Sequence, residues 1–325
     1  MEEPMKTAML FCILFMFGSG LMALTGYGTT APVINDTVDP ILSITAPVVS
    51  NVSASQRTDG SYLYRVYADD GSSPPMPENF ILVEGGTFNN GTSDVTISSF
   101  YIDKYELTQS GYQAVMGENP SHFSGNLDRP VEQVSWFNAI EYCNRRSIQE
   151  GLTPCYSYSS YGTNPANWPG GWNSTSSNHT NVSCNWTANG YRLPTEMEWQ
   201  FAARGGNQTH NYSYSGSNDL NDVGWYWYNW GSANRSTHSV GALAANELGT
   251  FDMSGNVWEW VWDIYGSYPS GSQTNPTGAN SGSYRVRRGG SWDSYANLCT
   301  VSNRFFYRAT YGNPYIGFRC VRVSP

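Results

Sequence analysis

Two short motifs near the end of the chain enclose a segment rich in aromatic and small polar residues. The first motif is Arg287-Arg288-Gly289-Gly290-Ser291-Trp292 and the second is Ile316-Gly317-Phe318-Arg319-Cys320. Between them Tyr, Phe, Asn, Ser and Asp recur. We interpret the two motifs as fixed positions of the fold. The segment between them is then the part of the chain that decides its function.

The composition favours a fold built from loops. Charged residues make up 13% of the 325 residues, against about 25% in a typical soluble protein. Aromatic residues reach 15%, with 12 Trp and 23 Tyr. Rings and hydrogen bonds must therefore stabilise much irregular backbone. The net charge of −9 argues against a nucleic acid or an anionic membrane as the partner, because both require basic surfaces.

Residues 1–26 have the pattern of a signal peptide. Lys6 precedes an apolar stretch over residues 8–17, and small residues follow up to Ala23. Cys12 follows a bulky Phe11, which disfavours a lipoprotein signal. We expect an exported bacterial protein, in the periplasm, on the cell surface or outside the cell. An uncleaved membrane anchor is the alternative, and no later membrane span is expected.

The remainder divides into a linker and one main domain. Residues 27–78 are polar and contain two strand-like runs, 48–54 and 62–67, around a turn at 58–61, which indicates a β-hairpin. A Ser- and Pro-rich boundary at 72–77 leads to the main domain, residues 79–325.

The main domain alternates short strands, short helices and loops. Strands are expected at 80–88, entering a glycine turn, and at 95–102. Thr108, Ser135 and Thr195 are placed to begin helices that run to Met116, Ser147 and Arg204. A Ser-, Asn- and Trp-rich insertion occupies residues 156–189. Three short helices among strands and loops predict an α+β fold with little regular secondary structure.

Several phrases of the main domain resemble the formylglycine-generating enzyme, or sulfatase-modifying factor, family. They are Gly85-Gly86-Thr87-Phe88, Val134-Ser135-Trp136, Gly190 to Trp199 with residues 202–206, Gly249 to Trp260, Arg288 to Trp292, and Gly317-Phe318-Arg319. The resemblance covers residues 79–323 and implies the C-type-lectin-like fold of that family. It also implies that Arg192, Glu196, Trp199, Trp258 and Trp260 are structural core residues.

The resemblance does not extend to the family's copper site. Active members carry two copper-binding cysteines, three and eight residues after the motif serine. Counted from Ser291, these positions are Ser294 and Cys299. A hydroxyl is not a soft copper ligand, so copper-dependent oxidase activity is not expected. Iron chemistry of a related branch is also not expected, because the four histidines show no ligand spacing. The rival hypothesis is an oxidoreductase that modifies a protein cysteine or other substrate with Cys299 as its catalytic residue.

A calcium site is the metal centre that the resemblance implies. The family's Gly-Asn-x-Trp-Glu turn binds Ca²⁺ through main-chain carbonyls and a carboxylate, which correspond here to Gly255, Val257 and Glu259. Ser254 or Asn256 is a candidate for a further oxygen ligand. The alternative is that Glu259 accepts hydrogen bonds from buried backbone or from an arginine.

Five cysteines remain after the signal segment, and an exported protein is expected to oxidise most of them. The resemblance implies a disulfide between Cys143 and Cys320. Cys155 and Cys184 lie at the two ends of the insertion, and we expect them to pair, leaving Cys299. Exchange among the last three stays open. The plain alternative for Cys299 is a buried thiol.

The segment 292–315 has the composition of a recognition surface. Tyr, Ser and Asn dominate antibody paratopes, where rings supply contact area and small polar groups adapt. The segment also resembles variable regions diversified by retroelements, in which mutated Asn codons yield Tyr, Ser, Asp and Phe. The candidate binding residues are Trp292, Asp293, Ser294, Tyr295, Asn297, Phe305, Phe306, Tyr307, Tyr311, Asn313 and Tyr315.

The leading hypothesis is therefore an exported, non-catalytic protein that binds a protein or glycan ligand through residues 292–315. Two alternatives stay open beside the Cys299 oxidoreductase. In the first alternative the rings of the segment are ordinary core packing. In the second the chain is a structural surface protein without a specific ligand.

Overall fold

The computed structural model describes residues 49–56, 62–68, 78–229 and 235–324. The chain divides into two units, residues 1–75 and 76–325. In the first, β1 (Val49–Gln56) pairs antiparallel with β2 (Tyr62–Ala68). The expected signal peptide and the hairpin turn lie outside the described residues. None of the helices within the described ranges combines the length and apolar character needed to cross a membrane.

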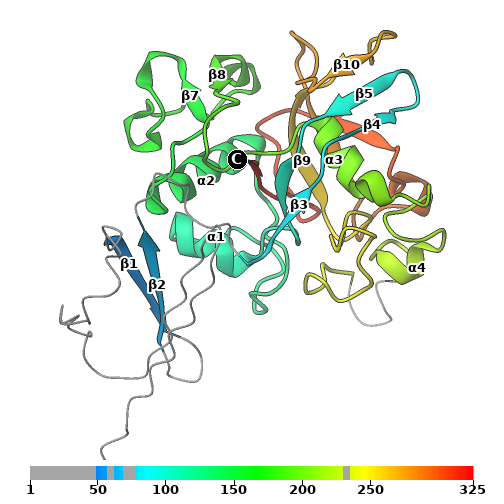
Figure 1. The fold of residues 1–325 in the computed structure, drawn as a ribbon, viewed down its shortest axis with the longest axis horizontal. Coiled ribbons are helices and arrows are strands. Elements are labelled where there is room, and N and C mark those ends of the chain that lie inside the picture. The colour runs from blue at the N-terminus through cyan, green and yellow to red at the C-terminus, as the bar shows by residue number, and fades with distance from the viewer. Residues whose placement is uncertain (1–48, 57–61, 69–77, 230–234, 325) are drawn as a thin grey trace, which may run out of the picture. The chain divides into compact units, whose positions relative to one another are not determined.

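The second unit is an α+β fold in which short elements are joined by long loops, as the sequence predicts (Figure 1). A four-stranded sheet has the order β12-β11-β9-β13, and two three-stranded sheets have the orders β10-β5-β4 and β14-β6-β3. A separate hairpin pairs β7 with β8. The strands are β3 (Phe80–Val83), β4 (Gly86–Asn89), β5 (Asp94–Ile97), β6 (Phe100–Asp103), β7 (Tyr156–Tyr158), β8 (Val182–Cys184), β9 (Trp258–Ile264), β10 (Gln273–Thr274), β11 (Arg285–Arg288), β12 (Arg304–Tyr307), β13 (Ile316–Gly317) and β14 (Val321–Val323).

The expected strand at 95–102 is two strands in different sheets. β5 ends at Ile97 and β6 begins at Phe100. The break coincides with the close approach of Gly85, where an added Cβ would lie 2.7 Å from the Ile97 carbonyl oxygen and 2.9 Å from the Ser99 nitrogen. The buried residues are Val95 and Ile97 before the break and Phe100 and Ile102 after it, so the alternation shifts by one position at Ser98-Ser99.

Side-chain caps begin the three longer helices where the sequence predicts. The Thr108 side chain accepts a hydrogen bond from the Gly111 N–H at the start of α1 (Gln109–Met116). Ser135 starts α2 (Trp136–Gln149) and Thr195 starts α3 (Glu196–Ala203), each within a reciprocal capping box. A fourth helix, α4 (Leu220–Val223), is a single turn that the sequence pattern does not reveal.

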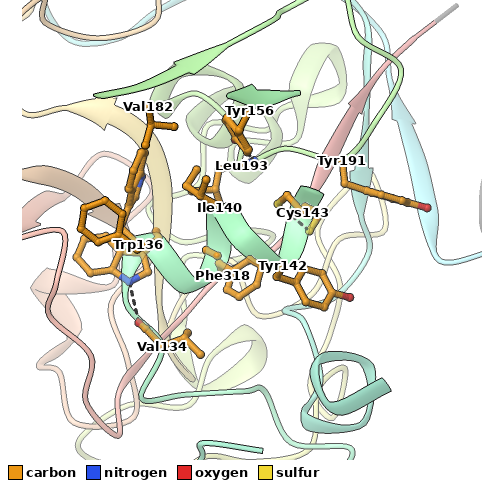
Figure 2. Packing of buried hydrophobic residues seen from close by; sticks show 14 of the residues in the cluster. Val134, Trp136, Ile140, Tyr142, Cys143, Tyr156, Val182, Tyr191, Leu193 and Phe318 are labelled. Atoms are coloured by element: carbon orange, nitrogen blue, oxygen red, sulfur yellow. Dashed lines mark hydrogen bonds between the residues drawn. The ribbon is translucent and has the colours of Figure 1, made fainter. Parts of the chain in front are cut away.

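Helix α2 lies at the centre of the larger apolar core. Trp136, Ile140 and Cys143 are fully buried and share this cluster with Phe318, from the second terminal motif (Figure 2). The Trp136 indole donates to the Val261 carbonyl at 3.0 Å, and the Trp260 indole donates to the Val134 carbonyl at 3.0 Å. The two indoles therefore bind the start of α2 to the central strand β9.

Buried arginines supply the second kind of support. Arg319 and Glu259 are completely buried, and the Arg319 guanidinium donates to both carboxylate oxygens of Glu259 at 2.8 and 2.9 Å. The remaining Arg319 donors bond to backbone carbonyls of loops, including that of Phe251 at 2.7 Å. Arg192 forms a similar two-bond pair with Glu198 at 2.7 Å. Loop carbonyls that lack strand partners thus find donors in side chains.

Removal of the Arg319 side chain tests this support. Because Arg319→Ala leaves Glu259 as an unpaired buried charge, we expect the free energy of unfolding to fall by about 3–5 kcal/mol. The control is Arg145→Ala, which removes an exposed ion pair with Glu141 and should cost less than about 1 kcal/mol. Urea denaturation followed by tryptophan fluorescence measures both. Equal losses in the two variants would mean that the buried pair does not hold the fold.

Candidate functional site

The segment 292–315 leaves the four-stranded sheet, returns as its edge strand and leaves again. After β11 the chain forms a turn of 3₁₀ helix at Ala296–Leu298, runs back as β12 beside β11, and loops to β13. Two glycines make the first turn, because Gly289 and Gly290 both have positive φ. An added Cβ on Gly290 would lie 2.5 Å from the Cys299 sulfur. Gly289 and Gly290 of the first terminal motif therefore form a structural turn.

The structure divides the candidate binding residues by exposure. Asp293, Tyr295, Asn297, Phe305 and Tyr307 are exposed, while Phe306, Tyr311, Asn313 and Tyr315 are half-buried. Trp292 and Ser294, which the sequence places on the surface, are 8% and 5% exposed.

Trp292 and Ser294 are buried because they hold the loop together. The Trp292 indole donates to the Pro314 carbonyl at 2.9 Å and packs edge-on against Phe123. The Ser294 hydroxyl accepts from the Ser291 N–H at 3.1 Å. These two residues connect the start of the segment to its end and to the motif, so their contribution to binding is indirect.

A group of aromatic rings surrounds Arg287. We call Arg287 with Trp258, Phe305, Tyr307 and Tyr315 the Arg287 cluster. The guanidinium carbon lies 4.7 Å from the ring centroid of Trp258, 5.1 Å from that of Phe305, and 5.6 Å from each tyrosine ring. Burial lowers the pKa of Arg287. Arg287 is 6% exposed, so the rings form a cover over a buried cation.

Hydrogen bonds between tyrosines fix the neighbouring rings. Tyr307 stacks on Tyr311 with centroids 3.6 Å apart, and the hydroxyls of Tyr311 and Tyr315 are 2.7 Å apart. The Asn313 amide donates to the Tyr311 hydroxyl at 2.7 Å. Burial, together with the Tyr315 hydroxyl, raises the pKa of Tyr311 to about 12. Tyr311 is therefore neutral at neutral pH, and its hydrogen bonds hold its ring in place.

A second group of rings surrounds Tyr295. Tyr228 is 72% exposed, and its ring centroid lies 6.1 Å from that of Tyr295. The ring centroids of Trp227 and Tyr295 are 5.7 Å apart, and the guanidinium carbon of Arg235 lies 3.8 Å from the ring centroid of Trp227. Trp227 and Tyr228 come from a separate loop, so the surface includes residues outside the segment.

A hollow of about 620 Å³ adjoins the segment on the side of the insertion. Arg308 and Thr310 line it from the segment, and hydroxyl residues 174–177 line it from the insertion. The Ser176 and Thr310 hydroxyls are 3.1 Å apart. The insertion therefore contributes to the same surface as the terminal segment.

Cys299 has the environment of a structural thiol. Its side chain is fully buried and faces the Tyr295 carbonyl at 3.7 Å. Burial raises the pKa of Cys299 to about 12. A catalytic cysteine requires an accessible thiolate, and this environment disfavours both accessibility and ionisation.

The other four cysteines are thiols in the structure. The sulfurs of Cys143 and Cys320 are 3.8 Å apart, which is van der Waals contact and not a bond of about 2.05 Å. Cys155 precedes Tyr156, whose strand partner is Cys184. Both expected pairs are thus neighbours, and the two disulfides stay predictions.

The expected calcium turn lies beside a group of buried acids. Glu259 accepts from Arg319 and from the Trp199 indole at 2.9 Å, which is the arginine alternative that the sequence left open. Its Oε1 accepts one hydrogen bond, from Arg319 at 2.9 Å, and keeps a second lone pair. Two acids that sequence reasoning missed, Glu106 and Asp252, also face this region. Within the part of the chain that the structure describes, no three His, Cys, Asp or Glu side chains could hold a metal ion together.

The electrostatics of Glu106 and Asp252 show an excess of negative charge. Burial and then Asp252 and Glu259 raise the pKa of Glu106 well above its usual value. Burial raises the pKa of Asp252 to about 6. Asp252 Oδ2 accepts from the Gly241 N–H at 2.7 Å, whereas Oδ1 is buried without a partner. A bound cation would satisfy that oxygen, with backbone carbonyls completing its shell.

Sequence reasoning also missed Arg287, Trp258, Trp227 and Tyr228 as parts of the surface. Arg287 had one visible signal. Residues 285–288 contain three arginines in a chain with few charges. In the fold Arg285 bonds to His179 and Arg288 to Glu196, whereas Arg287 lies against aromatic rings.

The fold and the site together define a C-type-lectin-like domain of the formylglycine-generating type. The family model described as a sulfatase-modifying factor enzyme 1-like domain matches residues 68–324. The chain therefore belongs to the sulfatase-modifying factor family. Chaperone protein LppX of Paenibacillus barcinonensis is 42% identical over 266 residues, which cover 76% of this chain and 90% of that protein. Formylglycine-generating enzyme of Bos taurus is 26% identical over 268 residues, with 70% of each protein covered.

Two solved structures are similar over nearly their whole length. Treponema denticola variable protein 1 has a TM-score of 0.68 and 33% identity, covering 75% of this chain and 95% of that one. CarF has a TM-score of 0.61 and 27% identity, covering 77% and 99%. These similarities extend over the second unit and support its fold.

Thiol alkylation tests the role of Cys299. With a pKa of about 12, on the order of one Cys299 thiol in ten thousand is ionised at pH 8, against roughly a quarter of free cysteines. We expect iodoacetamide to leave Cys299 unmodified in the folded protein and to modify it fully in urea, as measured by peptide mass spectrometry. Rapid modification of the folded protein would instead identify an activated thiol.

Proposed function

We propose that the chain is an exported, non-catalytic member of its family that binds a partner protein through the surface of residues 292–315. The observation that carries the proposal is the Arg287 cluster and its tyrosine neighbours. Exposed Phe305 and Tyr307 are backed by rings that hydrogen bonds hold in place. Aromatic side chains on a fixed base dominate the energetics of many protein interfaces.

The similar proteins support binding in preference to catalysis. One relative with 42% identity is named a chaperone, and one similar structure is named a variable protein. A chaperone has protein clients, and this favours a protein over a glycan as the partner. Diversification of the segment by a retroelement is part of the same proposal. A reverse-transcriptase gene beside a template copy of codons 292–315 would support it.

The chemistry at the copper positions gives the second argument. Ser294 Oγ is engaged with Ser291, and the Cys299 thiol is buried and neutral. Oxidation of a substrate cysteine by this chain would need a thiolate and a copper site, and neither residue is placed to provide them. Oxygen consumption with a sulfatase-motif peptide and copper would contradict the proposal.

Paired variants test the binding surface. The partner is first captured by crosslinking to the immobilised full chain and then identified by mass spectrometry. We expect the double variant Phe305→Ala/Tyr307→Ala to weaken its binding at least tenfold, because interface rings are typical hot spots. Tyr101→Ala is the matched control, since this half-buried ring lies on β6 in a sheet that excludes the segment.

Cys299→Ser distinguishes the rival oxidoreductase. Partner binding should be unchanged in this variant, as measured by titration calorimetry, because Cys299 is buried beneath the loop. Loss of a measurable oxidase activity together with retained binding would favour the rival hypothesis instead.

We also propose that a calcium ion binds beside Glu259, with Asp252 as a ligand and with backbone oxygens of Gly255 and Val257. The support is the partnerless Asp252 Oδ1 in a region with more buried acids than arginines. When bound, the ion would supply positive charge that stabilises the loop.

Calcium removal gives a pH-dependent signature. The pKa of Asp252 is higher in the folded chain than in the unfolded chain, so the protonated carboxyl favours folding and the ionised carboxylate disfavours it. The stability that the protonated carboxyl contributes is lost as the pH rises from about 4 to about 6. In EDTA, Asp252→Asn should therefore gain stability relative to the native chain over this range. In the presence of calcium above pH 6, Asp252→Asn should instead be less stable than the native chain, because the variant loses a charged ligand of the ion. Thermal unfolding that EDTA does not change would mean that no such site exists.

A further inference from the structure

Arg287 is a buried arginine without an acidic partner. Arg285 and Arg322 also lack one, but their Nε atoms donate to His179 and to the Asn189 carbonyl, whereas Nε and Nη1 of Arg287 have no hydrogen-bond partner. Arg288 and Arg304 bind Glu196, and Arg319 binds Glu259. Arg287 takes part in none of the ion pairs formed among the described residues. A buried charge without a counter-charge destabilises a fold, and such groups persist mainly where function requires them.

The polar atoms of Arg287 are also incompletely satisfied. Its Nε and Nη1 are buried and have no hydrogen-bond partner. The rings of the Arg287 cluster attract the cation through their faces, but a ring face does not accept N–H bonds as a carboxylate does. Each of these N–H groups can donate a charge-assisted hydrogen bond to a carboxylate oxygen.

We propose that Arg287 is the anchor for a carboxylate of the partner protein, an Asp or Glu side chain or a chain terminus. This inference rests on the proposed function and names the group that the surface recognises. The guanidinium receives the carboxylate, and Phe305, Tyr307 and Tyr315 pack around the apolar part of the bound residue.

The cover over Arg287 can open without disturbing the core. Phe305 and Tyr307 are 40% and 36% exposed, and both lie on the edge strand β12. Rotation of exposed side chains is fast and is a common change on binding. The fixed rings of Tyr311 and Tyr315 stay behind as one wall of the opened site.

The position of β12 favours an extended peptide as the bound segment. Among the described strands, β12 pairs with β11 alone, so its outer edge is free of strand partners. An extended peptide can add to such an edge, and every second side chain of that peptide then faces one side of the sheet. Arg287 and its strand neighbour Phe305 lie opposite each other in the register of β11 and β12. An acidic side chain of an added strand would reach this face.

A peptide display experiment tests the proposal. Random twelve-residue peptides are selected on the immobilised full chain, and the enriched peptides are synthesised with each Glu or Asp in turn changed to Gln or Asn. We expect enriched peptides to share an acidic residue next to apolar ones. The change of that residue should weaken binding at least tenfold in titration calorimetry. Arg287→Met should weaken binding equally. Combining Arg287→Met with the changed peptide should weaken binding no more than either change alone.

Two controls separate recognition from folding. Arg145→Met removes an exposed arginine of α2, outside the proposed binding surface, and should change affinity less than threefold. Arg287→Met should unfold at the same temperature as the native chain or a higher one, because a buried unpaired charge is replaced by an apolar side chain of similar length. A large fall in unfolding temperature would assign Arg287 a structural role and overturn the proposal.

The remaining outcomes separate this inference from the proposed function. Enriched peptides without a shared acid, or peptides indifferent to Arg287→Met, would overturn the inference and leave protein binding standing. Failure to enrich any peptide, together with Arg287-dependent binding of polygalacturonate, would assign the carboxylate to a glycan and overturn the protein partner.

Discussion

The ion pair between Arg319 and Glu259 is the interaction on which the rest of the second unit depends. Both side chains are completely buried, and the guanidinium also bonds to the carbonyls of Asp103, Lys104 and Phe251. Glu259 receives the Trp199 indole as well. One charge pair therefore joins the central strand, the C-terminal strands, helix α3 and a loop. A chain with 13% charged residues uses its arginines in the interior, where loop carbonyls need donors.

This arrangement explains why a fold with short elements supports a well-defined surface. The terminal motifs supply the turn at Gly289 and Gly290 and the buried Arg319, and both are fixed by close contacts. The segment between them is thereby attached at each end. Its exposed rings sit on an ordered base, so residues such as Tyr307 can change without loss of the core. Recognition and stability are divided between different residues.

Much of this could be predicted from the sequence. Helix starts depend on local caps, and Thr108, Ser135 and Thr195 begin helices as their side-chain chemistry dictates. The family motifs identified the fold. The break after Ile97 shows in the sequence only as a one-residue shift of the apolar pattern at Ser98-Ser99, and the approach of Gly85 that accompanies it is a contact between distant residues. The burial of Trp292 and Ser294 likewise depends on Pro314 and on the turn, which composition does not reveal.

The partners of the charged residues could not be predicted from the sequence either. A sequence shows that Arg287 and Glu259 are charged, but not that Arg287 lacks an acidic partner while Glu259 is paired with Arg319. Only the arrangement of β9, β11 and β12 brings Trp258 and Phe305 over Arg287. The unusual feature of the surface is thus a property of the assembled sheet.

Hydrogen exchange of the complex tests the central claim most directly. The full chain is compared with and without its captured partner, and deuterium uptake is measured by mass spectrometry along the second unit. The account predicts that protection on binding concentrates in residues 303–315 and in the adjoining insertion, with the core helices unchanged. Protection confined to other regions, with 303–315 exchanging as in the free protein, would contradict it.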